Sequence, residues 1–84
     1  MNAFMINSFV EAVINNIETQ VSKNLYYNEA NYFMYDKDVF KGLKIPTRRL
    51  KMEIVCAFNS TEFAKKNSLK LIFIEDNRYD LYFK

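Results

Sequence analysis

The sequence predicts one small α+β domain, in which an N-terminal amphipathic helix packs on a small antiparallel sheet that ends in a C-terminal β-hairpin. Apolar residues recur at helical spacing between residues 3 and 21, and two β-prone runs flank a turn-rich tetrapeptide near the C-terminus. A chain of 84 residues is also too short to build two independent cores. The domain is therefore expected to span residues 1–84.

The N-terminal helix is expected from Ala3 to about Val21. Its apolar residues share one helix face, and polar residues occupy the opposite face. Because Phe4, Met5 and Phe9 widen the apolar stripe, the helix either lies deep in the fold or offers a surface to a second copy of the chain. The stripe itself consists of Ile6, Val10, Val13, Ile14, Ile17 and Val21.

A strand and a short helix are expected next. The β-prone run at residues 32–35 predicts the strand. The short helix follows it, capped by Asp36 or Asp38, and ends at Gly42 or before Pro46.

Residues 47–58 fit two secondary structures. Leu50, Ile54 and Phe58 have helical spacing, but together with Met52 and Cys56 they also alternate as in a strand. Residue propensities favour the helix and the alternation favours the strand, so both structures remain open. After this segment, a capping signal at residues 59–62 predicts a short helix that ends near residue 67.

The C-terminal hairpin joins strands at residues 69–74 and 79–83. With Asp76 and Asn77 as the two turn residues, Glu75 pairs with Arg78. This register predicts a core face made of Ile72, Ile74, Tyr79, Leu81 and Phe83. Another element or a partner is expected to cover the opposite face, which carries Leu69, Leu71, Phe73 and Tyr82 beside Asp80 and Lys84.

The composition argues against catalysis and against a bound cofactor or metal. Histidine is absent, which excludes Ser-His and Cys-His catalysis within the chain, and a single glycine cannot form a phosphate-binding loop. Cys56, the only cysteine, cannot form an internal disulfide and is expected to be an inert core residue because its neighbours are apolar. We therefore expect a protein that is not an enzyme and holds no cofactor or metal.

The N-terminal apolar residues are not expected to form a signal peptide or a membrane span, because polar residues interrupt them and no basic segment precedes them. A cytoplasmic protein without a membrane partner is expected. A domain of this size is only marginally stable, so a homodimer or a stable complex with a partner is plausible.

Positive charge is concentrated in one segment. Residues 1–40 carry a net charge of −3 and residues 52–84 are balanced, so the excess comes from five cations within eleven residues. Such a cluster can contact DNA or RNA phosphates or an acidic protein surface, although it is also compatible with a solvated face. We call these residues the basic segment: Lys41, Lys44, Arg48, Arg49 and Lys51.

If residues 39–45 and 47–58 are both helices, the stretch VFKGLKIPTRRL, from Val39 to Leu50, resembles winged-helix DNA-binding domains. The resemblance implies that the first turns of the second helix meet the major groove and that the C-terminal hairpin is the wing. It also implies DNA contacts by Arg48, Arg49 and Lys51. A DNA-binding transcriptional regulator is therefore one of two functions to test.

The other function is binding, and inhibition, of a larger protein or nucleoprotein. Tyr26, Tyr27, Tyr32 and Tyr35 form a candidate aromatic interface, because tyrosine buries a large area and keeps a polar tip. In size and style the chain resembles short accessory proteins of phages and mobile elements that act in this way. This non-enzymatic interaction module is the preferred hypothesis from the sequence.

Overall fold

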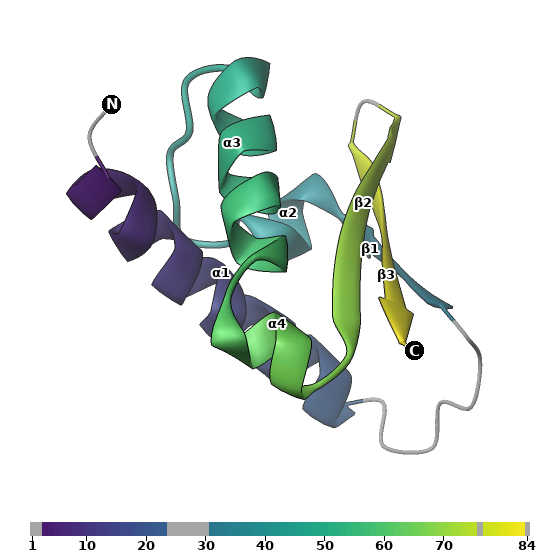
Figure 1. Ribbon diagram of the computed structural model, residues 1–84. Coiled ribbons are helices and arrows are strands. Elements are labelled where there is room, and N and C mark those ends of the chain that lie inside the picture. Colours follow the sequence, from purple (N-terminus) through teal and green to yellow (C-terminus); the bar gives the residue numbers. More distant parts are fainter. Residues whose placement is uncertain (1–2, 24–30, 76, 84) are drawn as a thin grey trace.

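The computed structural model describes residues 3–23, 31–75 and 77–83. These residues form four helices and three strands, and three of the helices follow one another between the first and second strands (Figure 1). In chain order the elements are α1 (Ala3–Lys23), β1 (Asn31–Tyr35), α2 (Asp36–Val39), α3 (Arg48–Asn59), α4 (Glu62–Lys66), β2 (Leu69–Glu75) and β3 (Arg78–Phe83).

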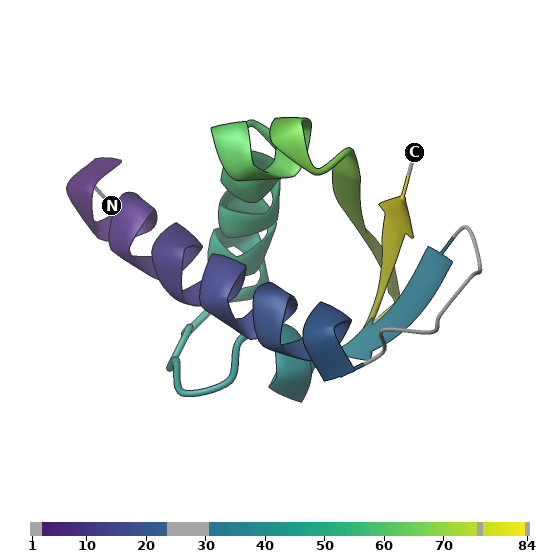
Figure 2. The same ribbon diagram turned by 90° about the horizontal axis from the view of Figure 1, so that it is seen from below.

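The three strands form one antiparallel sheet in the order β1-β3-β2. Helices α1, α3 and α4 lie together on one side of this sheet, as the two perpendicular views show (Figures 1 and 2). The predicted α+β fold, with an N-terminal helix, a small antiparallel sheet and a C-terminal hairpin, is confirmed.

The core lies between the helices and the facing side of the sheet. Helix α1 contributes Val13 and Ile17, and α3 contributes Ile54 and Phe58, all of which are fully buried. Burial of each such side chain stabilises the fold by about 1.5–3 kcal/mol relative to its exposed state. From the sheet, the core receives Met34, Leu71, Tyr79 and Leu81.

Residues 47–58, for which the sequence allowed either a helix or a strand, form a helix with its N-cap. Thr47 caps α3 through its hydroxyl oxygen, which accepts a hydrogen bond from the Leu50 N–H at 3.1 Å. The buried residues of α3 then follow helical spacing: Leu50, Ile54, Val55 and Phe58. This periodicity turns Cys56 outward, so the prediction that Cys56 is a core residue was wrong.

The two short helices begin at capping residues. Thr61 caps α4 by accepting from the Ala64 N–H at 3.1 Å, which confirms the helix predicted there. Helix α2 is shorter than predicted, and its N-cap is Tyr35 rather than an aspartate. Asp38 stabilises the start of the helix from within it, because its carboxylate accepts a hydrogen bond from the Tyr35 N–H at 3.1 Å. The chain then leaves the helix, and Gly42 adopts the left-handed φ of 80° that favours glycine.

The hairpin forms with the predicted Glu75–Arg78 pair, but the predicted faces of β2 were wrong. A β-bulge between Phe73 and Glu75 adds one residue to β2, so Phe73 rather than Ile74 shares a face with Tyr79. A one-residue shift moves every side chain of a strand to its opposite face. Leu71 is therefore buried in the core, and Ile74 is 43% exposed.

Asn59 joins the end of α3 to the edge strand β2. Its amide nitrogen donates to the Leu71 carbonyl at 2.8 Å, and its amide oxygen accepts from the Leu71 N–H at 2.7 Å. Both backbone groups of Leu71 therefore point away from β3, and a side chain from α3 satisfies them.

Candidate nucleic-acid interface

The basic segment runs from the end of α2 to the first turns of α3. Four of its five side chains are exposed to solvent: Lys41, Lys44, Arg48 and Arg49. The connection between the helices therefore carries two exposed lysines, and the start of α3 carries two exposed arginines.

The start of α3 is suited to an anion. Arg48 and Arg49 are its first two residues, and the Arg49 side chain is 91% exposed. Its ion pair with Glu53, at 3.8 Å, is an exposed pair of the kind that contributes little to stability. Cations at this position oppose the helix dipole, whereas a bound phosphate would interact favourably with both the arginines and the positive end of the dipole.

The hairpin turn lies at the same end of the molecule as the start of α3, at the top of Figure 1. The Arg48 guanidinium carbon is 5.6 Å from the centre of the Phe73 ring in β2, which brings the two elements together. Beside the turn, the exposed Glu75 side chain opposes phosphate binding. The positive surface is therefore on α3 and the connection before it, not on the hairpin.

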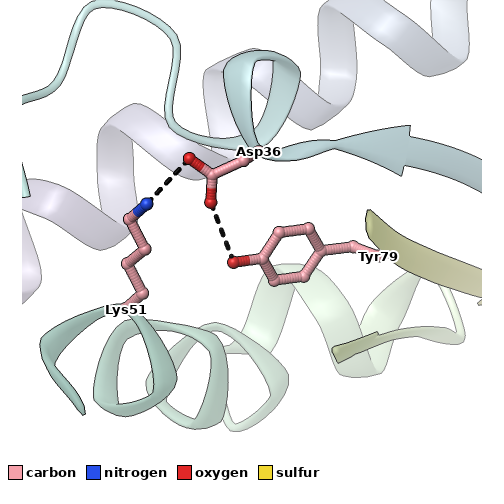
Figure 3. Close-up of polar contacts among 3 residues, drawn as sticks. All are labelled: Asp36, Lys51 and Tyr79. Carbon is pink, nitrogen blue, oxygen red and sulfur yellow. Dashed lines mark hydrogen bonds and ion pairs between the residues drawn. The ribbon is translucent and has the colours of Figure 1, made fainter. Parts of the chain in front are cut away.

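Lys51 differs from the rest of the basic segment because it is held inside the domain. Its Nζ is 2.8 Å from the Asp36 Oδ2 and 5.6 Å from the centre of the Phe40 ring. The Tyr79 hydroxyl donates to the other Asp36 oxygen at 3.2 Å, so one carboxylate joins α2, α3 and β3 (Figure 3). Lys51 is occupied by this internal contact, unlike Arg49.

Burial of Tyr79 raises its pKa well above the ordinary value of 10.0, and the adjacent Asp36 carboxylate raises it further. The positive charge of Arg48 lowers the Tyr79 pKa, but this effect is smaller than the other two. The folded protein therefore retains this phenolic proton at a pH at which the unfolded chain releases it.

The free energy of unfolding is expected to fall as the pH rises above about 10, by up to about 1.4 kcal/mol per pH unit from this one group. The contribution is fully present below that pH, because both states are then protonated. Urea denaturation at pH 9 and pH 11 measures the loss, and Tyr79→Phe should show a smaller one. Equal losses in the two proteins would assign the effect to other residues.

The predicted aromatic interface is described only in part. Tyr26 and Tyr27 lie outside the described residues, and only the backbone of Tyr32 is described, in β1. Tyr35 is 50% exposed on the sheet face that points away from the helices. The register of β1 places Phe33, which is 51% exposed, on that same face.

Phe33 was missed in the sequence, although its i, i+2 spacing from Tyr35 was a signal. Tyr35 was predicted as an interface residue, and Asp80 and Tyr82 were placed on this outer face of the sheet. Arg78 lies across it, with its guanidinium carbon 4.0 Å from the centre of the Phe33 ring and its Nε 3.7 Å from the Asp80 Oδ1. None of the described helices covers this face (Figure 2). The register assigns both apolar and charged residues to it: Phe33, Tyr35, Lys70, Ile72, Ile74, Glu75, Arg78, Asp80 and Tyr82.

The described residues contain no group of three or more cysteine, aspartate or glutamate side chains that could hold a metal ion. None of the described helices is both long enough and apolar enough to cross a bilayer.

No protein-family model, curated protein or solved structure matches this chain.

Proposed function

We propose that this protein binds duplex DNA, with the first turn of α3 at the major groove and the lysines of the preceding connection near the phosphates. The observation that carries the proposal is the exposure of Arg48 and Arg49 at the start of a firmly capped helix. In helix-turn-helix proteins, the first residues of the second helix contact base edges, and arginine is the commonest reader of guanine.

The order of the elements supports this proposal. Helix α1, strand β1, helices α2 and α3, and the β2–β3 hairpin follow one another as in a winged-helix domain, and β3 lies between β1 and β2. The resemblance required residues 47–58 to be helical, and α3 covers residues 48–59. Helix α4 is an addition between the second helix and the hairpin.

Fluorescence-anisotropy titration of mixed-sequence duplex DNA tests the proposal, at low and at physiological salt. We expect micromolar binding with a steep salt dependence. The variant Arg48→Ala/Arg49→Ala should bind about 10- to 100-fold more weakly, with a salt slope lower by about 2, because two phosphate or base contacts are lost.

The matched control is Lys65→Ala/Lys66→Ala on α4. This variant also removes two positive charges from exposed residues, but these residues lie at the opposite end of α3 from the arginines. A similar loss in both variants would show that net charge alone determines binding, and an absence of binding by the unaltered protein would refute the proposal.

Binding of a partner protein is the second candidate function, and the outer face of the sheet favours it. Among the described residues four large hydrophobic side chains are exposed, and three of them lie on this face: Phe33, Tyr35 and Ile74. Aromatic residues and arginine are the side chains that most often dominate protein interfaces. If the DNA titration is negative at both salt concentrations, affinity capture with the unaltered protein and with Phe33→Ser becomes the deciding comparison.

A further inference from the structure

We infer that Asp36 is a positioning residue, which holds the first turns of α3 in place relative to the hairpin turn. Its effect on DNA binding rests on the proposed function. Asp36 itself is only partly exposed, and we assign it no contact with DNA.

Three different parts of the fold meet at Asp36. Its carboxylate accepts from Lys51 of α3 at 2.8 Å and from the Tyr79 hydroxyl of β3 at 3.2 Å (Figure 3). Its backbone N–H donates to the carbonyl of Asn77, in the hairpin turn, at 2.8 Å. One residue therefore bonds to both elements whose relative placement matters for a duplex.

Lys51 lies one turn beyond Arg48 and Arg49 on α3, so its position constrains theirs. The side chains of Lys51 and Asp36 are 25% and 27% exposed, so water and salt screen this pair less than an exposed pair. Lys51 is also near the Phe40 ring, and Phe40 packs edge to face on Tyr79 with ring centres 5.8 Å apart. The contact is thus embedded in packed aromatic residues.

Electrostatics and positioning predict opposite effects when Asp36 is neutralised. The variant Asp36→Asn raises the net charge from +2 to +3 and should strengthen DNA binding if only charge matters. If Asp36 positions α3, the variant should weaken binding, because an amide cannot pair with Lys51 as a carboxylate does. The sign of the change distinguishes the two explanations.

The first measurement compares the DNA affinity of Asp36→Asn with that of Glu11→Gln, which makes the same change in charge at an exposed residue of α1. We expect Asp36→Asn to bind about 3- to 10-fold more weakly, consistent with the loss of one charge-assisted contact. In the Arg48→Ala/Arg49→Ala background the same change should no longer weaken binding, because Asp36 acts through these arginines.

The second measurement reads the position of α3 without DNA. Cys56 is exposed on α3 and is the only cysteine in the chain, so Glu75→Cys adds a second labelling site at the hairpin. Spin labels at these two residues should give a narrow distance distribution in the parent and a broader or shifted one with Asp36→Asn. Tyr79→Phe, which leaves the net charge unchanged, should change the distance distribution in the same direction but by less. It replaces Asp36→Asn as the test if Asp36→Asn does not fold.

The outcomes separate the two hypotheses. An unchanged distance distribution in both variants would overturn the positioning role, even if the unaltered protein binds DNA. Equal or tighter DNA binding by folded Asp36→Asn would also overturn it. A changed distribution in a protein that does not bind DNA would support the positioning role and refute the proposed function.

Discussion

Replacement of Phe58 by alanine is expected to lower the free energy of unfolding by about 3–5 kcal/mol. Phe58 is fully buried at the centre of the core, where its ring packs edge to face on Phe63 with centres 6.2 Å apart. The substitution removes apolar area from the interior and leaves a cavity that the helices and the sheet can close only in part. A domain of this length has a total stability of roughly 4–13 kcal/mol, so much of it would be lost.

Chemical denaturation followed by far-ultraviolet circular dichroism measures this loss. The control is Phe33→Ala, which removes the same ring from the outer face, where Phe33 is 51% exposed. It forfeits mainly the contact with Arg78, which is worth about 0.5–1 kcal/mol at an exposed site. Equal losses in the two variants would contradict the arrangement in which only one face of the sheet contacts the core.

Replacement of Asn59 by alanine is expected to lower the free energy of unfolding by about 2–4 kcal/mol. The Asn59 amide makes two hydrogen bonds, at 2.8 and 2.7 Å, to the carbonyl and N–H of Leu71. Without this amide, two partly buried backbone groups lose their partner, and each such group costs about 1–3 kcal/mol, less what water recovers.

Hydrogen exchange of the Leu71 amide reports on this contact directly. It should exchange much faster in Asn59→Ala than in the unaltered protein at a pH and temperature where both are folded. The control is Asn67→Ala, which removes an exposed amide that donates to the Phe63 carbonyl of the adjacent helix α4. If the Leu71 amide exchanged at the same rate in both variants, Asn59 would not be its partner in solution.

Long periodic elements could be predicted from the sequence because their signal is repeated over many residues. Helix α1 and the two hairpin strands are of this kind. The segment with Leu50, Ile54 and Phe58 could not be assigned, because these positions fit both periods. The Thr47 cap and the burial of Val55, which breaks the alternation of a strand, resolve it as a helix.

The sequence predictions were wrong about which side chains of β2 and α3 face the core. The β-bulge between Phe73 and Glu75 reversed the predicted faces of β2, and no turn residue or glycine in the sequence marks it. Cys56 was assigned to the core from apolar neighbours that point to the other side of the helix.

The predicted basic segment is exposed at four of its five positions, and the exception depends on a contact between distant residues. Lys51 and Asp36 are separated by 15 positions in the chain, and both also fit ordinary surface roles. Their pairing follows from the packing of α3 against α1 and β2 and of α2 against α1 and β1, which residue spacing alone does not specify.

The position of Asn59 also limits how molecules of this protein can associate through their sheets. A fibre of stacked strands grows only if each molecule offers two free edges, one to the molecule before it and one to the molecule after it. In the middle of β2 an amide of the same chain already occupies the groups that an incoming strand would need. Strand addition would then have to use the β1 edge, and contact through a single edge ends with a pair of molecules instead of continuing as a filament.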